Sequence, residues 1–375
     1  MKLAIVTNAF PRCRFELFER LARDNNHNIT IFKYADWWDA ESKWLEVKKW
    51  QAVGFKLPFM TDDVYFHFDP RVLWAITHGD WEVIIAYGYG SLTTYLVALV
   101  AKLRRIPFIL WSDARLEYEL RCSSLRLWTK SLLHRLSVHF IASGTSALLF
   151  LQWMGIHQDN ITVSPYAINN EALYRNYLKW QSISSDIRSE LGISRDAVVI
   201  LYVGRLVREK GIEELIASFA RLPDKQKCAL VLVGDGKDLP VFKTMVKEMN
   251  LSQVIFVGRV PHDLVAKYYA IGDIFVLPSY KDVWGLVVNE AMVCGLPIVT
   301  TYEVGAWRDL VKHGENGFVI PARDVKALIE ALQILCRDPK LRKTMGQRSY
   351  EIIQQWDLRH AVDSVELALK KIRNG

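Results

Sequence analysis

The sequence predicts an α/β protein with two doubly wound domains. First, its 375 residues exceed what a single compact core usually holds. Second, short apolar runs alternate with helix-like stretches through both halves, which is typical of parallel sheets with crossover helices. Third, the 51% apolar and 24% charged residues lie in the normal range for folded enzymes and argue against disorder.

The first half opens with a predicted strand at residues 2–7, followed by an apolar stripe at helical spacing over 15–22. A second helical pattern covers 91–103. Short apolar runs predict further strands at 28–32, 83–86, 108–111 and 139–142. We therefore expect an N-terminal domain over 1–170.

The second half repeats this alternation and predicts a C-terminal domain over 196–355. Its strands are expected at 198–203, 229–233, 254–257, 274–277 and 297–300. Between the domains, 171–195 is polar and contains no strand-like run, so we expect a hinge there. The tail over 356–375 has apolar residues near helical spacing, which predicts an amphipathic helix that covers another surface, with the first domain as a candidate.

Charge and cysteine usage limit the classes of partner and compartment. The net charge of +7 suits an anionic partner such as a nucleotide diphosphate, a lipid phosphate or a membrane surface. The five cysteines are scattered without a Cys-x-x-Cys pair, which excludes a disulfide framework or zinc knuckle and favours the cytoplasm. No apolar run reaches the roughly 18 residues that a bilayer span requires. The start of the chain is interpreted as a strand rather than a secretory signal.

A candidate phosphate site follows the predicted strand at 198–203. Residues 204–211 place Arg205 and Lys210 five positions apart just before a helical pattern. Arg205 offers a planar fork for two phosphate oxygens, Lys210 offers a compact charge, and Gly204 permits close approach of the backbone. The alternative is that both cations are solvated surface residues.

A second candidate site follows the predicted strand at 274–277. Asp282 lies in the expected loop and Glu290 lies about one turn inside the next helix, so both carboxylates can flank one ligand. Carboxylates accept hydrogen bonds from vicinal hydroxyls, while the amides of Gly285, Leu286 and Val287 at the helix start suit a phosphate. The alternative is a capping aspartate followed by a helix with one buried acid.

With these residues in place, the second half resembles glycosyltransferase family 4. Members of that family share the two-lobed GT-B fold, with two Rossmann-like domains facing across a cleft, and a Glu-x7-Glu motif that Asp282 and Glu290 match. Other segments in the same order and spacing are Gly234-Asp235-Gly236, Gly258-Arg259-Val260, Gly295-Leu296-Pro297 and Gly314-Glu315-Asn316-Gly317. A dinucleotide-binding glycine motif is disfavoured, because Leu239 occupies the third glycine position.

The resemblance also implies roles for these residues. Arg205 and Lys210 would bind the diphosphate of a nucleotide sugar, and Glu290 would bind its ribose. Asp282 would bind the donor sugar, while Gly234 and the segment from Gly258 through Arg259 to Val260 would lie near the nucleotide. Asp282 stands where the family usually has Glu, which shortens its reach by one methylene and leaves the donor sugar open.

The activity implied by the resemblance is a retaining transfer of a hexose. The donor would be linked to UDP or GDP, and the acceptor would be a saccharide or a lipid-linked saccharide in polysaccharide or glycolipid assembly. No metal, further cofactor or nucleic acid is expected to participate. Two alternatives remain open: a non-catalytic sugar or nucleotide binder, and a GT-B nucleotide-sugar epimerase.

The first domain carries weaker candidates for the acceptor site. The loop at 8–11 lacks the paired glycines of many relatives. Asp113 follows the strand at 108–111, where many relatives have a histidine, and either faces the transferred sugar or caps a helix over 114–120. The segment 88–91 either presents amides to an acceptor phosphate or is a plain tight connection.

Two further segments of the first domain are candidates for interfaces. The helical stretch 124–136 has one stripe with Arg126, Lys130 and His134, and an apolar stripe with Leu125, Trp128, Leu132 and Leu136. It either lies on an anionic membrane at the cytoplasmic face or is a packing helix with a solvated basic face. The tryptophans Trp37, Trp38, Trp44 and Trp50 either bind acceptor sugar or belong to the core.

Overall fold

The computed structural model describes residues 1–7, 12–33, 45–49, 53–55 and 66–374. Contacts divide the chain into two compact units. Unit 1 comprises Met1–Tyr166 with Leu358–Gly375, and unit 2 comprises Ala167–Asp357. Each unit is an α/β structure with a parallel sheet at its centre.

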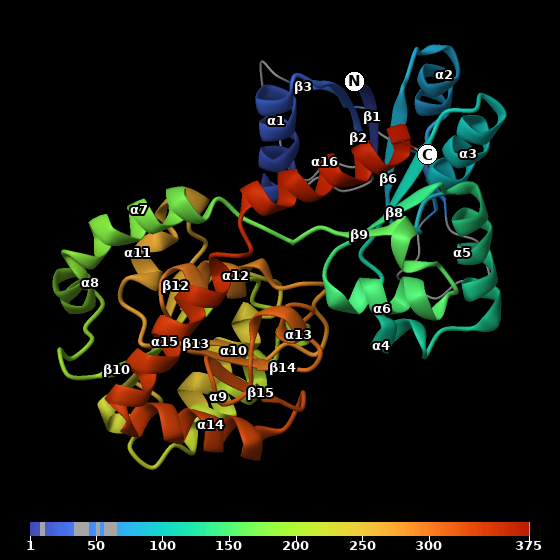
Figure 1. The fold of residues 1–375 in the computed structure, drawn as a ribbon. Helices are drawn as coiled ribbons and strands as arrows, with labels where there is room; N and C mark the ends of the chain where they lie inside the picture. The colour runs from blue at the N-terminus through green and yellow to red at the C-terminus, as the bar shows by residue number, and fades with distance from the viewer. Residues whose placement is uncertain (8–11, 34–44, 50–52, 56–65, 375) are drawn as a thin grey trace. The chain divides into compact units, whose positions relative to one another are not determined.

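Unit 1 has a seven-stranded sheet with the order β3-β2-β1-β6-β7-β8-β9 (Figure 1). Its strands are β1 (Lys2–Thr7), β2 (Asn28–Lys33), β3 (Leu45–Lys49), β6 (Val83–Tyr87), β7 (Phe108–Ser112), β8 (His139–Ala142) and β9 (Ile161–Val163). A separate antiparallel pair joins β4 (Val53–Phe55) and β5 (Phe66–Phe68). The apolar runs form strands because both faces are covered: Val83–Tyr87 and Phe108–Ser112 are buried at every position.

Helices cover the sheet of unit 1. They are α1 (Arg12–Asn25), α2 (Pro70–His78), α3 (Leu92–Leu103), α4 (Leu116–Glu119), α5 (Ser124–Leu136), α6 (Thr145–Trp153) and α16 (Leu358–Asn374). The core contains buried residues from α2, α3 and α6, such as Ile76, Val97 and Leu151, against strand residues such as Ile84 and Leu110. The C-terminal helix α16 packs against α1, β8 and β9 and therefore belongs to this unit.

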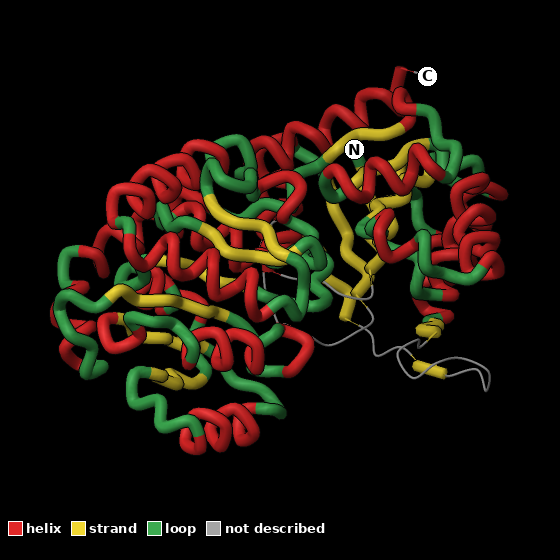
Figure 2. The backbone as a smooth tube through the Cα atoms, turned by 90° about the horizontal axis from the view of Figure 1, so that it is seen from below, coloured by secondary structure: helices red, strands yellow, loops and turns green. Residues whose placement is uncertain are grey.

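Unit 2 has a six-stranded sheet with the order β12-β11-β10-β13-β14-β15. Its strands are β10 (Val198–Val203), β11 (Cys228–Val233), β12 (Val254–Gly258), β13 (Ile274–Leu277), β14 (Ile298–Thr301) and β15 (Gly317–Ile320). Its helices are α7 (Asn170–Gln181), α8 (Ser184–Glu190), α9 (Ile212–Ala220), α10 (Leu239–Glu248), α11 (Ala266–Tyr269), α12 (Leu286–Val293), α13 (Trp307–Leu310), α14 (Val325–Arg337) and α15 (Pro339–Ile353). Strands run between flanking helices in Figure 2.

The winding of the unit 2 sheet reverses between β10 and β13. β10 pairs with β11 on one side and with β13 on the other, so successive crossovers leave in opposite directions. Loops at the carboxyl ends of two such strands diverge and leave room for a ligand. The loops that carry Lys210 and Asp282 follow these two strands.

The segment 171–195 differs from the predicted hinge. It contains α7 and α8 and lies within unit 2. Asn169 caps α7, because its side chain accepts a hydrogen bond from the Ala172 amide at 3.1 Å. The polar composition of the segment reflects a largely exposed helix with one buried face, where Leu173 lies, rather than irregular structure.

Several first-domain candidates fall outside the described residues. They are the loop at 8–11 and the tryptophans Trp37, Trp38, Trp44 and Trp50. Among the residues that the structure describes, no helix is both long and apolar enough to cross a bilayer.

Two buried histidines of unit 1 make its stability depend on pH. Burial lowers the pKa of His134 and of His139 to about 4, with smaller contributions from Lys130 and Lys371. Because the pKa of an unperturbed histidine is 6.5, the unfolded chain binds protons between pH 6.5 and 4 that the folded chain does not. Stability is therefore fully present above pH 6.5 and falls as the pH decreases through this window.

We expect the free energy of unfolding to fall by about 2 kcal/mol at pH 5 through His134, and by less through His139, which lines a cavity that water can enter. Thermal melting followed by circular dichroism at pH 7 and pH 5 measures this. The variant His134→Gln with His139→Gln should lose less stability on acidification than the wild type. His157→Gln, at an exposed imidazole, should behave as the wild type. Equal acid sensitivity in all three proteins would contradict the prediction.

Candidate active site

The loop 204–211 leaves β10 and enters α9 through two constrained glycines. Gly204 has a φ of +151°, and its amide donates to the Val233 carbonyl at 2.9 Å. Gly211 has a φ of +71°, and a Cβ at this position would lie 2.2 Å from the Pro278 carbonyl oxygen. Only glycine allows the loops after β10 and β13 to approach this closely.

Lys210 connects these two loops directly. Its Nζ donates to Asp282 Oδ2 at 2.7 Å, and the two side chains are 11% and 18% exposed. Solvent and salt therefore screen this pair less than a surface ion pair. The sequence placed Lys210 and Asp282 at the same ligand, and the structure brings them into contact at the point where the sheet reverses its winding.

A cavity of about 500 Å³ opens at the carboxyl ends of β10, β11 and β12. Its lining residues are Val203, Gly204, Arg205, Val233, Gly234, Asp235, Gly236, Arg259, Val260 and Val265. Close packing of the loops shapes its floor, since a Cβ on Gly234 would lie 1.9 Å from the Gly204 carbonyl oxygen. Five predicted donor-site residues, Gly204, Arg205, Gly234, Arg259 and Val260, thus meet at one cavity.

Arg205 differs from Lys210 in its surroundings. Its side chain is 65% exposed and its Nη2 donates to Glu209 Oε1 at 2.8 Å. A surface pair of this kind contributes little to stability, so the guanidinium can exchange Glu209 for an anion at small cost. Arg205 therefore combines access to the cavity with a fork that fits two phosphate oxygens.

The helix α12 follows the loop after β13 and carries Glu290. Gly285 has a φ of +89° at the start of this helix, and the first intrahelical bond runs from the Val288 amide to the Gly285 carbonyl. The amides of Leu286 and Val287 precede that bond and form the electropositive end of the helix. Trp284 steadies this start, because its Nε1 donates to Asn289 Oδ1 at 2.8 Å.

Glu290 is buried on α12 and has a partner that the sequence did not indicate. Its Oε2 accepts a hydrogen bond from the Tyr269 hydroxyl at 2.7 Å. Burial raises the pKa of Glu290, while the charge of His262 and the hydrogen bond from Tyr269 act in the opposite direction. Tyr269 is 21 residues away on α11, so no local pattern links it to Glu290.

The structure brings two groups of the predicted site residues together. Gly204, Arg205 and Gly234 represent the group that lines the cavity. The ion pair of Lys210 with Asp282 forms the second group, which joins the two switch-point loops. Glu290 does not line the cavity and is buried against α11.

In unit 1, Asp113 lies in a polar cluster at the carboxyl end of β7. Arg14 from α1 donates to its Oδ2, and the Ser143 hydroxyl donates to its Oδ1. Arg14 is buried, and its guanidinium lies 3.9 Å from the centre of the Tyr87 ring. The alternative that Asp113 caps a helix over 114–120 is wrong, because α4 begins at Leu116 with Arg115 at the capping position.

The segment 88–91 connects β6 to α3. Gly88 has a φ of +69°, and its amide donates to the Trp111 carbonyl at 3.0 Å. Ser91 stands at the start of α3 and is buried. The amide of Gly88 is thus already hydrogen-bonded to β7 at the carboxyl end of the sheet.

Lys130 and His134 of the predicted basic stripe on 124–136 point inward, whereas Arg126 has a side chain that is 56% exposed. Lys130 is 3% exposed, and its Nζ lies 2.6 Å from Glu119 Oε1. His134 is buried as well, with its Nε2 2.9 Å from the Tyr89 hydroxyl. The helix packs against the core through Leu133, but these two basic residues face neither solvent nor a membrane, so both expected roles for them are wrong.

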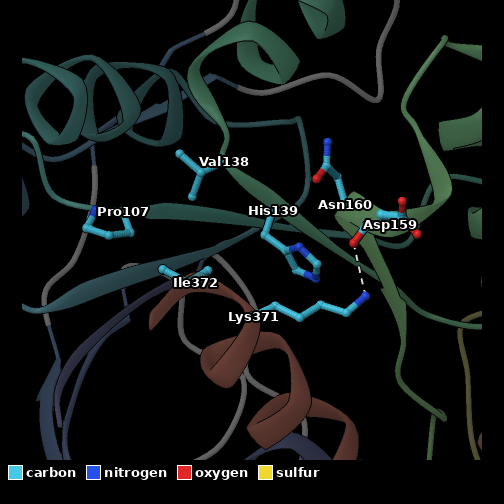
Figure 3. Close-up of a pocket in the computed structure, with 7 residues that line it drawn as sticks. All are labelled: Pro107, Val138, His139, Asp159, Asn160, Lys371 and Ile372. Atoms are coloured by element: carbon cyan, nitrogen blue, oxygen red, sulfur yellow. Dashed lines mark hydrogen bonds between the residues drawn. The ribbon is translucent and has the colours of Figure 1, made fainter. Parts of the chain in front are cut away.

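A second cavity, of about 660 Å³, lies at the opposite edge of the unit 1 sheet (Figure 3). It is lined by Pro107, Val138, His139, Asp159, Asn160, Lys371 and Ile372. Lys371 on α16 donates from its Nζ to the Asp159 carbonyl at 3.0 Å, and His139 Nε2 lies 2.8 Å from Thr162 Oγ1. The cavity lies at the amino ends of β7, β8 and β9 and contains none of the predicted site residues.

Comparison with known proteins bears on both fold and site. Residues 184–352 match the model of the family glycosyl transferases group 1. Among solved structures, HepE of Anabaena in complex with UDP has a TM-score of 0.76 and 20% identity, covering 99% of this chain and 100% of that chain. Sucrose-phosphate synthase of Thermosynechococcus elongatus has a TM-score of 0.74 and 20% identity, covering 100% and 99%. The fold is GT-B.

The sequence relatives are named as enzymes of sugar transfer or conjugation. N-acetyl-alpha-D-glucosaminyl L-malate synthase of Bacillus anthracis is 28% identical over 172 residues, which cover 46% of this chain and 44% of that protein. D-inositol 3-phosphate glycosyltransferase of Corynebacterium jeikeium is 35% identical over 170 residues, which cover 43% and 40%. The matched part thus spans less than half the length of these relatives.

Proposed function

We propose that this protein is a retaining hexosyltransferase that uses a UDP- or GDP-linked sugar as donor. The proposal rests on the Lys210–Asp282 pair at the reversal of the unit 2 sheet, together with the cation-bearing cavity at the ends of β10 to β12. The family match over 184–352 covers both features. The solved relative HepE, with UDP and with UDP-glucose in its complexes, supports a nucleotide-sugar donor.

In this proposal, the nucleotide diphosphate binds at the loop 204–211. Arg205 exchanges Glu209 for phosphate oxygens, and Lys210 neutralises charge that develops on the leaving diphosphate as the glycosidic bond breaks. The amides at the start of α12 form an electropositive helix end that also attracts the diphosphate. Asp282 then accepts hydrogen bonds from hydroxyls of the donor sugar, and Glu290 accepts them from the ribose.

The acceptor in this proposal is a saccharide or a lipid-linked saccharide of polysaccharide or glycolipid assembly. A relative from Bacillus subtilis named for teichuronic acid biosynthesis and one named alpha-monoglucosyldiacylglycerol synthase support this class. Asp113, held by Arg14 and Ser143 in unit 1, is our candidate for contact with the acceptor. We also propose a cytoplasmic location, because the five free cysteines suit a reducing compartment.

Thermal melting with nucleotides and nucleotide sugars tests the donor proposal. UDP or GDP should stabilise the protein, by about 2.7 kcal/mol at a hundredfold excess over the dissociation constant, and the matching nucleoside without phosphates should not. The matching nucleotide sugar should then release free nucleotide on turnover with acceptor. Stabilisation by no nucleotide diphosphate would refute the proposal, and product that is only an isomerised donor would identify an epimerase.

A further inference from the structure

Two cysteines of unit 2 lie sulfur to sulfur although they are far apart in the chain. Cys228 is the first residue of β11, and Cys336 is the last residue but one of α14. Their Sγ atoms are 3.7 Å apart, across 108 positions of sequence. Both are free thiols, so the fold brings together a reduced pair that no sequence spacing indicates.

Other contacts hold the two segments around this pair together. Arg337 on α14 has its Nε 3.5 Å from Oδ2 of Asp224, which lies four residues before Cys228. Arg342 on α15 donates from its Nη1 to the Cys336 carbonyl at 3.0 Å. A disulfide needs its sulfur atoms about 2.0 Å apart, so small side-chain rotations bring the pair to bonding distance.

The surroundings favour ionisation of one thiol of the pair. The hydrogen bond with Cys336 lowers the pKa of Cys228 against the effect of burial, and the positive charge of Arg342 acts in the same direction as the hydrogen bond. The same hydrogen bond raises the pKa of Cys336, which therefore stays protonated. A thiolate beside a protonated thiol is the arrangement in which oxidation of the first sulfur leads to a disulfide with the second.

Neither metal binding nor simple packing explains the pair as well. In the part of the chain that the structure describes, no group of three or more His, Cys, Asp and Glu side chains could hold a metal ion. Cysteines that serve only to pack a core are buried and inert, whereas reactive ones are partly exposed and ionise readily. Cys228 is 3% exposed, but Cys336 is only partly buried, so a small oxidant has access to the pair.

We propose that Cys228 and Cys336 form a reversible disulfide when the protein meets hydrogen peroxide. The Cys228 thiolate attacks one peroxide oxygen, so the O–O bond breaks and a sulfenic acid forms, while the leaving hydroxide takes up a proton and becomes water. The Cys336 thiol then attacks the sulfenic sulfur, which forms the S–S bond and releases the hydroxyl as a second water. Two thiols are oxidised and one peroxide is reduced to two waters. A dithiol reverses the change by thiol–disulfide exchange.

The disulfide closes a long loop of unit 2 and stabilises its folded state. The closed loop runs from the amino end of β11 to the end of α14 and contains every strand from β11 to β15. Cross-links that close long loops restrict the unfolded chain more than those that close short ones. In a reducing cytoplasm such a pair rests as thiols and responds to oxidation.

The modification site is separate from the proposed sugar transfer and needs no donor chemistry. The donor cavity lies at the carboxyl end of β11, where Val233 and Gly234 line it, whereas Cys228 lies at the amino end of the same strand. Failure of the test below therefore leaves the proposed function unaffected, and failure of the proposed function leaves this site unaffected.

Peptide mapping of the full chain tests the bond. Dilute protein is treated with hydrogen peroxide, the remaining thiols are alkylated, and trypsin should then release peptides 228–237 and 327–337 joined by a disulfide. Dithiothreitol added before alkylation should separate the two peptides. The proposal is overturned if both peptides carry only alkylated or over-oxidised cysteine, or if non-reducing electrophoresis shows that the bond joins two chains.

Matched variants and thermal melting test the effect on stability. The oxidised wild type should melt about 5 to 15 °C above the reduced protein, as expected for a disulfide in a unit of this size. Cys336→Ser should show no such rise, and Cys228→Ala provides the same test should the serine variant fold poorly. Cys122→Ser, at another partly exposed cysteine, should behave as the wild type. Equal melting temperatures for oxidised and reduced wild type, or a rise that persists in Cys336→Ser and Cys228→Ala, would refute the stabilising disulfide.

Discussion

Lys210→Ala is expected to lower donor turnover by about 10²- to 10³-fold, the range for loss of one preorganised group that stabilises developing charge. Lys210 is the buried cation at the point where the unit 2 sheet reverses its winding. Because its Nζ stabilises charge that grows on the leaving diphosphate, the loss should appear in kcat more than in KM. Release of nucleotide from the donor in the presence of acceptor measures both constants.

The ion pair with Asp282 offers another explanation for the same loss, which a double variant separates. Lys210→Ala leaves Asp282 as a part-buried carboxylate without its cation, which is itself destabilising. If Lys210 served only to neutralise Asp282, then Lys210→Ala with Asp282→Ala would recover wild-type affinity for the nucleoside diphosphate alone, which carries no sugar for Asp282 to bind. We expect no recovery, because the diphosphate still lacks its cation.

Arg208→Ala is the matched control for this experiment. Arg208 lies on the same loop, but its side chain is 63% exposed and pairs with Glu213 at 3.0 Å. Its removal should change turnover by less than a factor of about three, since exposed pairs contribute little. A loss in Arg208→Ala as large as that in Lys210→Ala would show that general positive charge, and not the position of Lys210, matters.

The sequence predicted the sheet of unit 2 well because its strands are buried on both faces. Such strands appear as continuous apolar runs, and the five predicted strands match β10 to β14 within one residue at each end. β15 was missed, because its short run Gly317–Ile320 begins with glycine inside a turn-like motif. The helices at 171–195 were missed, since exposed helices without an apolar stripe resemble loops in composition.

The site was predictable where it depends on local sequence and not where it depends on distant partners. The glycines and cations of the switch-point loops are local signals, and Gly204, Arg205 and Gly234 do line one cavity. The partners of Glu290 and Asp113 are Tyr269 and Arg14, from elements that only the tertiary structure brings near. For the same reason, the periodicity of 124–136 defined its stripes without showing which stripe faces the core.

Glu290→Gln is expected to weaken donor binding by about 10- to 100-fold. A hydroxyl that donates to a carboxylate forms a charge-assisted hydrogen bond, whereas one that donates to the neutral glutamine side chain does not. Burial raises the pKa of Glu290 above its usual value, so the charged form that accepts from ribose is lost as the pH falls through that raised pKa. Wild-type affinity should therefore decrease on acidification, and the affinity of Glu290→Gln should change less. Calorimetric titration of the nucleotide diphosphate at several pH values measures this.

A 2′-deoxyribose nucleotide shows whether the ribose is the group that Glu290 binds. The wild type should bind the deoxy nucleotide more weakly than the ribose form, whereas Glu290→Gln should discriminate between them far less. Tyr269→Phe is the control, because it removes the hydroxyl that donates to Oε2 and keeps both the ring and the carboxylate. If Glu290→Gln retained the full discrimination of the wild type, the buried carboxylate would serve only to hold α12 against α11. The ribose would then be recognised by the residues that line the cavity.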